Sequence, residues 1–125
     1  MRRLQVVAIV YIQFLLTVSC RMTYELRIYK ANPGKIEALC ARFRNHTVAL
    51  FAKHNMESIG YWLEDAHSDV LTYVIKHSGD PAKNWEAFIA DPVWIAAKEA
   101  SEVDGALVES IDARYMTPTD FSALK

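Results

Sequence analysis

The chain has 125 residues, of which 52% are hydrophobic, so it is long enough for one globular domain with a core. Its formal net charge is -1 and its Lys and Arg residues are scattered, which argues against the basic stripe of a nucleic-acid-binding protein. Its cysteines, Cys20 and Cys40, do not imply a disulfide framework.

Residues 1–21 form a hydrophobic leader before the first predicted strand. Two arginines precede an apolar run from Leu4 to Val18 that is broken only by two glutamines. This pattern is typical of a signal peptide, and the run is short for a membrane span of about 20 residues. The alternative is that translation starts at Met22. We therefore expect a cytoplasmic protein if Met22 is the start and an exported one otherwise, with membrane contact only if the leader is retained.

The first strand is predicted over residues 24–29, where apolar and polar side chains alternate. Strict alternation is typical of a strand with one face in a core. We therefore expect Leu26 and Ile28 to face the core. The side chains expected on the opposite face are Glu25, Arg27 and Tyr29.

A long amphipathic helix is predicted after this strand. The pair Asn32-Pro33 is typical of an N-cap and the first helical residue. Apolar residues then recur at helical spacing, with an interruption at His46-Thr47. The helix is expected to end near Asn55, a residue that tolerates the left-handed conformation. The basic residues expected on its solvent side are Arg42, Arg44 and Lys53.

The rest of the chain alternates strands and helices. Strands are predicted over three segments rich in β-branched and aromatic residues: 56–63, 70–76 and 107–116. Two short helices begin at Asp80-Pro81 and Asp91-Pro92. The aromatic residues of these helices that are expected in the core are Trp85, Phe88 and Trp94. Residues 118–125 form a surface tail.

The element order β-α-β-β-α-β over residues 22–117 predicts an α+β, ferredoxin-like fold with a four-stranded antiparallel sheet. Right-handed crossovers place the fourth strand beside the first, and the third between the first and second. The helices then cover one face. The residues expected on the other face are Glu25, Arg27, Tyr29, Trp62, Asp112 and Arg114. Because this set is too aromatic to be left in water, we expect two sheets to pack face to face in a homodimer, a dimeric α/β barrel.

Five pieces of the sequence carry a resemblance to a known family. They are Tyr24-Glu25-Leu26-Arg27 with Tyr29, the Pro33-Gly34-Lys35 turn, Lys53-His54, Gly60-Tyr61-Trp62, and Asp91-Pro92 with Trp94. With them the chain resembles the NIPSNAP family over about residues 22–117, although Asn55 stands where family members usually carry a glycine. The resemblance implies the ferredoxin-like fold and the dimer, and it brings no established chemistry.

The candidate ligand-binding residues lie on the face that the helices leave uncovered, apart from one histidine of the long helix. They are Arg27, Tyr29, Trp62, Asp112, Arg114 and His46. The two arginines are expected on adjacent strands, where their planar donor forks would clamp a carboxylate or another oxyanion between aromatic walls. In the alternative, Glu25 and Asp112 pair with the arginines in purely structural ion pairs.

The histidines do not have the spacing of a metal site, because His46 and His54 are eight residues apart instead of four. The sequence contains no nucleophile elbow or Gly-rich phosphate loop. Haem-degrading proteins of this fold commonly use a histidine on the later helix, and the segment from Pro81 to Val103 has none. We therefore expect neither a metal nor a cofactor.

Two classes of function remain open. In the first, the protein binds or transforms a small anionic or aromatic molecule in a pocket between sheet and helices. By fold analogy alone, such an enzyme would be monooxygenase-like or isomerase-like and independent of a cofactor. In the second, it is a non-catalytic homodimeric protein-interaction module. A cavity with convergent polar groups favours the first class, and a filled barrel with a large exposed apolar patch favours the second.

Overall fold

The computed structural model describes residues 22–125, and the predicted leader lies outside the described residues. Four strands form an antiparallel sheet in the order β2-β3-β1-β4. Their bounds are β1 (Thr23–Ala31), β2 (Met56–Leu63), β3 (Val70–His77) and β4 (Val108–Met116). The predicted ferredoxin-like α+β fold and strand order are confirmed.

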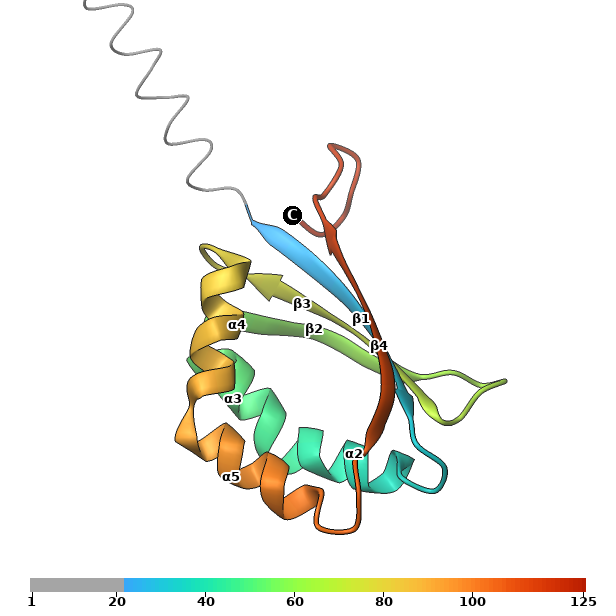
Figure 1. The fold of residues 1–125 in the computed structure, drawn as a ribbon. Coiled ribbons are helices and arrows are strands. Elements are labelled where there is room, and N and C mark those ends of the chain that lie inside the picture. The colour runs from blue at the N-terminus through green and yellow to red at the C-terminus, as the bar shows by residue number, and fades with distance from the viewer. Residues whose placement is uncertain (1–21) are drawn as a thin grey trace, which may run out of the picture.

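The helices lie on one side of the curved sheet (Figure 1). Their bounds are α2 (Ile36–Arg42), the π-helical segment η1 (Phe43–Thr47), α3 (Val48–Lys53), α4 (Pro81–Ala90) and α5 (Pro92–Ser101). As predicted, Asp80 and Asp91 cap α4 and α5, each accepting a 2.9 Å bond from a backbone N–H of the first turn. No helix within the described part of the chain is long and apolar enough to cross a membrane.

The two faces of β1 are reversed relative to the prediction. Glu25 and Tyr29 point toward the helices and are buried, whereas Leu26 and Ile28 are half-buried on the opposite side, here called the open face. Glu25 pairs in the sheet with Ile75, which is fully buried in β3. Alternation predicts the strand correctly, but the polar side chains take the inner face because α4 and β3 supply them with hydrogen-bond partners.

A β-bulge in β2 changes which side chains face the core. The register between β2 and β3 shifts between Ser58 and Gly60. Ile59 consequently lies with Trp62 beside a groove of the open face, whereas Tyr61 packs against the core on the inner face. The Trp62 indole covers Gly60, where a Cβ atom would overlap the ring. This position therefore accepts glycine alone unless Trp62 moves.

The segment η1 interrupts the long helix, which runs from Ile36 to Lys53. The predicted start at Asn32-Pro33 is wrong, because Pro33 and Gly34 form a turn and Lys35 is the N-cap, whereas the predicted end is confirmed by Asn55 with a left-handed φ of 63°. A π turn holds about one residue more than an α turn and rotates the side chains that follow. Thr47 is buried and His46 exposed as a result, which explains the interruption in the apolar pattern. The predicted solvent position of Arg42 is wrong, because this side chain is buried against α5.

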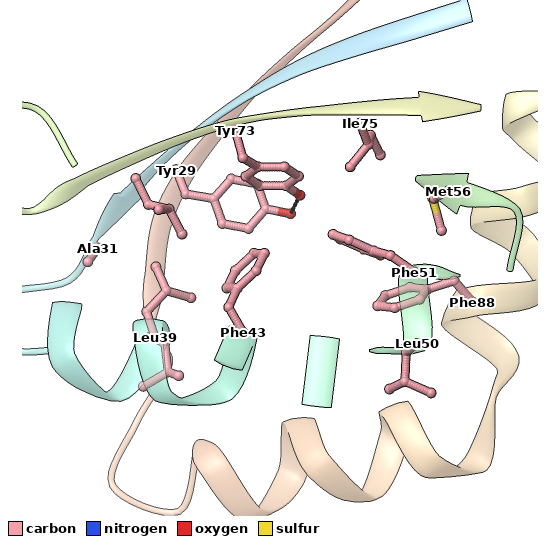
Figure 2. Packing of buried hydrophobic residues seen from close by; sticks show 12 residues of the cluster. Tyr29, Ala31, Leu39, Phe43, Leu50, Phe51, Met56, Tyr73, Ile75 and Phe88 are labelled. Atoms are coloured by element: carbon pink, nitrogen blue, oxygen red, sulfur yellow. Dashed lines mark hydrogen bonds between the residues drawn. The ribbon is translucent and has the colours of Figure 1, made fainter. Parts of the chain in front are cut away.

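An aromatic cluster fills the space between the sheet and the helices (Figure 2). The ring centre of Phe51 lies 6.1 Å from that of Phe43, 5.8 Å from Tyr73 and 5.1 Å from Phe88. The hydroxyl of Tyr73 donates to that of Tyr29 at 2.9 Å, so this buried polar group is paired. The predicted core position of Phe88 is confirmed, and its packing sets one wall of the site described next.

Candidate functional site

Two adjoining cavities lie between the sheet and helices α4 and α5. They measure about 440 and 500 Å³ and have seven lining residues in common, so they form one cleft. The residues that line both are Tyr29, Trp85, Phe88, Trp94, Lys98, Glu102 and Ile111. Four of these side chains are aromatic, and the two charged ones come from the last turn of α5 (Lys98) and its C-cap (Glu102). The cleft is therefore a largely apolar space with a few polar groups.

A buried carboxylate holds one wall of the cleft. Glu25 Oε1 accepts hydrogen bonds from His77 Nε2 and Trp85 Nε1, and its Oε2 accepts one from Arg27 Nη1, all at 2.7 Å. The Asn84 amide donates to His77 Nδ1 at 3.1 Å, which leaves the imidazole proton on Nε2, facing Glu25. Burial alone would raise the pKa of Glu25, but the three donors lower it below its usual value, so Glu25 is ionised. This network fixes the Trp85 ring in the cleft wall.

Arg27 belongs to the same network. Its Nε and Nη2 donate to the Tyr29 hydroxyl at 3.2 and 3.0 Å, and its Cζ lies 4.2 Å from the centre of the Trp85 ring. Burial alone would lower the pKa of Arg27, but the Tyr29 and Tyr73 hydroxyls and the Glu25 carboxylate raise it, so the cation persists. Because these partners occupy its donor edges, Arg27 positions the cleft wall and does not present a free fork to a ligand.

The predicted clamp of Arg27 and Arg114 is wrong. Arg114 pairs in the sheet with Leu26, whose side chain is on the open face, whereas Arg27 is on the inner face. Successive residues of a strand point to opposite sides, so the two guanidiniums are separated by the sheet. The structural alternative is confirmed, because Arg27 pairs with Glu25 and the 66% exposed Arg114 pairs with Asp112, each at 2.7 Å.

The remaining candidate residues are dispersed. Tyr29 lines the cleft together with Arg27. Trp62, which is 55% exposed, and Asp112 lie on the open face. His46 is exposed in η1 and lies outside the cleft lining. Within the part of the chain that the structure describes, no group of three or more His, Cys, Asp or Glu residues could hold a metal ion.

Arg42, at the end of α2, enters the cleft from a position that the sequence did not predict. Its side chain is 4% exposed, its Nη1 lies 3.2 Å from Ser101 Oγ and 3.3 Å from Glu102 Oε1, and its Cζ lies 5.1 Å from the centre of the Trp94 ring. A signal for this position exists, because Arg42 follows Leu39 by three residues on the apolar side of the helix. Because arginine is usually exposed, a prediction from sequence nevertheless places Arg42 on the solvent side of the helix.

The model of the NIPSNAP family matches residues 24–123. The chain belongs to the NIPSNAP family. The resemblance carried by its short sequence pieces is thus confirmed. No match is found among proteins with curated descriptions.

Solved structures of NIPSNAP proteins share the fold. A NIPSNAP family protein of unknown function from Agrobacterium tumefaciens is 25% identical, with a TM-score of 0.71 over 84% of this chain and 95% of that one. Another NIPSNAP family protein from the same organism is 28% identical, with a TM-score of 0.72 over 83% of this chain and 99% of that one. A candidate antibiotic biosynthesis monooxygenase from Chloroflexus aurantiacus is 13% identical, with a TM-score of 0.57 over 83% of this chain and 99% of that one. This similarity shows a common fold alone.

Two of the sequence pieces typical of the NIPSNAP family, Lys53-His54 and Asp91-Pro92, meet between the end of α3 and the junction of α4 and α5. Asp91 Oδ2 accepts from Lys53 Nζ at 2.8 Å and from His54 Nε2 at 2.7 Å, while its Oδ1 accepts from the Val93 backbone at 2.9 Å. The bonds from Lys53 and His54, followed by that from Val93, lower the pKa of Asp91 well below its usual value. This part of the NIPSNAP pattern ties α3 to α5 and so helps to position Trp94 in the cleft.

Proposed function

We propose that this NIPSNAP protein binds a small molecule with a flat, apolar body in the cleft. The observation that carries this function is the set of four rings along the cleft walls, from Tyr29, Trp85, Phe88 and Trp94. Ligand sites typically have volumes of about 300–1,000 Å³, with mostly hydrophobic and aromatic walls and a few polar groups. The cleft has this composition, with its polar groups at the end formed by α2 and α5.

The rings are held in place before any ligand enters. The Trp85 indole donates to Glu25 at 2.7 Å, and the Phe88 and Trp94 rings lie 4.7 Å apart between centres. Side chains that are already ordered lose less conformational entropy on binding. This preorganisation supports binding of a rigid, planar molecule over packing of a flexible chain.

Calorimetric titration with naphthalene-2-carboxamide, a neutral planar probe, tests the cleft. We expect Trp94→Leu to weaken binding about tenfold, because a ring contact and its apolar area are lost. Trp62→Leu makes the same replacement on the open face and is expected to leave the affinity unchanged. Equal weakening by both variants, or by neither, would count against the cleft as the binding site.

Native mass spectrometry of the protein purified from its own organism tests the proposal without a chosen probe. A bound mass that is released on denaturation, and that Trp94→Leu reduces, supports the proposed function. Protein that carries no adduct and also fails to bind the naphthalene probe contradicts it.

We further propose that the protein is a homodimer that pairs through the open face. Leu26 and Val74 are half-buried there, and Trp62 and Met116 are exposed. The segment 117–125 lies against the same face and would form part of the interface. Apolar side chains gathered on one sheet face favour burial against a second copy across a two-fold axis.

Light scattering at micromolar concentration is expected to give the mass of two chains for the wild type and of one chain for Val74→Glu. The reason is that the new carboxylate would be buried in the interface without a partner. Lys83→Glu, on the exposed side of α4, is the control and should remain dimeric. A monomeric wild type would refute the dimer, and a dimeric Val74→Glu would refute the use of this face.

The alternative function is a homodimeric protein-interaction module without a ligand. The exposed Trp62 and Leu63 favour it, because contiguous exposed apolar surface marks sites of protein association. Convergent polar groups beside an open cleft favour ligand binding. We therefore prefer the ligand-binding function to the interaction module.

A further inference from the structure

Arg42 is buried at the α2–α5 end of the cleft with part of its guanidinium unused. The hydrogen bonds that it donates within the described part of the chain leave from Nη1, to Ser101 Oγ at 3.2 Å and Glu102 Oε1 at 3.3 Å. Both are long for a charged donor, for which about 2.7–2.9 Å is typical. Among residues 22–125, its buried Nε has no hydrogen-bond partner. The edge formed by Nε and Nη2 is therefore unused.

A buried, charged N–H without an acceptor destabilises a protein, because it has lost water and gained no other partner. The surroundings of Arg42 offer a reason for its retention. Its side chain lines the 440 Å³ cavity together with Phe43 and Trp94. The missing acceptor can thus be supplied by a molecule that occupies the cleft.

The charged residues of this cavity leave one positive charge in excess. Lys98 Nζ bonds one oxygen of Glu102 at 2.7 Å, and Arg42 contacts the other oxygen of the same carboxylate. Glu109 also lines the cavity, but it pairs with Lys30 at 3.3 Å. Glu99 lines the adjoining 500 Å³ cavity from an exposed position and is absent from the lining around Arg42. At the Arg42 end two cations therefore share one carboxylate, and a monoanionic ligand would balance them.

We propose that Arg42 binds the carboxylate of the molecule in the cleft, and that this molecule is an aromatic carboxylic acid. The assignment rests on the ligand binding proposed above and names its substrate class. A planar carboxylate accepts two parallel bonds from the Nε–Nη2 edge after a small rotation of the guanidinium away from Ser101. The ring of the ligand then lies along Trp94. A phosphate dianion would bring one charge too many into these apolar walls.

The π-helical segment η1 supports this assignment. It begins directly after Arg42, and the Thr47 hydroxyl donates to the Arg42 carbonyl oxygen at 3.3 Å. Phe43 and Thr47 of this segment both line the cleft. Single π turns inside helices occur frequently at functional sites, because the extra residue redirects side chains.

Calorimetry on the full chain with naphthalene-2-carboxylate and naphthalene-2-carboxamide separates recognition of the anion from recognition of the ring. We expect the wild type to prefer the carboxylate about 10- to 100-fold, as is typical of a hydrogen-bonded charge pair. Arg42→Gln should abolish this preference and retain the affinity for the amide. Arg42→Lys keeps the charge without the planar fork and should show an intermediate preference. Arg44→Gln, on an exposed neighbour in the same helix, is the matched control and should behave as the wild type.

The outcomes separate this inference from the proposed function. Equal binding of acid and amide by the wild type, or a preference that survives Arg42→Gln, refutes the role of Arg42 and leaves the cleft as a ligand site. Failure of both probes to bind the wild type contradicts both ideas. Thermal melting verifies that the variants fold. If Arg42→Gln does not fold, Arg42→Lys decides, because a preference at the wild-type level would show that the planar edge is not used.

Discussion

Replacing Glu25 by glutamine is expected to lower the free energy of unfolding by about 3–5 kcal/mol. The groups bonded to the Glu25 carboxylate, from His77, Trp85 and Arg27, are all donors. The NH₂ group of glutamine would face one of them, and the buried Arg27 would lose its counter-ion. Urea unfolding of the wild type and the variant at neutral pH measures the difference.

The pH dependence distinguishes an ionised Glu25 from one that only packs well. The pKa of Glu25 in the folded protein lies below the 4.5 of a free side chain. Its charge therefore stabilises the fold fully above about pH 4.5, and this stabilisation is lost as the pH falls toward the folded-state pKa. We expect the difference between the wild type and Glu25→Gln to shrink below pH 4.5.

Glu109→Gln is the control, since it makes the same replacement in the half-exposed ion pair with Lys30. It should change the free energy of unfolding by less than about 1 kcal/mol, because solvent screens such pairs. Similar losses for Glu25→Gln and Glu109→Gln would rule out a special role for the buried network.

Replacing Phe51 by alanine is also expected to cost about 3–5 kcal/mol of folding free energy. Phe51 is 1% exposed, and its ring centre lies 5.1 to 6.1 Å from the rings of Phe43, Tyr73, Trp85 and Phe88. Its removal leaves a cavity among side chains from both the sheet and the helices, which cannot close without moving secondary structure. Denaturant unfolding at neutral pH measures the loss.

Phe121→Ala is the matched control, because Phe121 is 85% exposed in the tail. Its effect should stay within about 0.5 kcal/mol. A loss below 1 kcal/mol for Phe51→Ala would mean that the aromatic cluster is more loosely packed than the structure indicates. Phe51 also lines the cleft, so the variant should change the affinity for naphthalene-2-carboxamide as well.

The network of Glu25 and the aromatic cluster connect folding stability to the cleft. Trp85 belongs to both, because its indole N–H donates to Glu25 and its ring lies 5.6 Å from that of Phe51. Variants that loosen either group should therefore also loosen the cleft wall. For this reason, binding is best tested with Trp94→Leu and Arg42→Gln, which leave both groups in place.

Interactions between residues close together in the sequence allow several helix boundaries to be predicted from the sequence alone. The pairs Asp80-Pro81 and Asp91-Pro92 predict helix starts because an aspartate cap and a proline act within a single turn, and both helices begin there. Asn55 predicts a helix end for the same reason. The strand order then follows from element order and crossover handedness, which do not depend on which side chains meet.

Tertiary structure alone decided which side chains form the site. Alternation predicts that β1 has two unlike faces, but Glu25 turns inward because His77 and Trp85, 52 and 60 residues away, donate to it. Arg42 is buried because Ser101 and Glu102, 59 and 60 residues away, contact its guanidinium. A periodic pattern reports the spacing of residues along one element, whereas the burial of a charge depends on a partner from another. The cleft and its arginine therefore became visible only once the distant partners were placed.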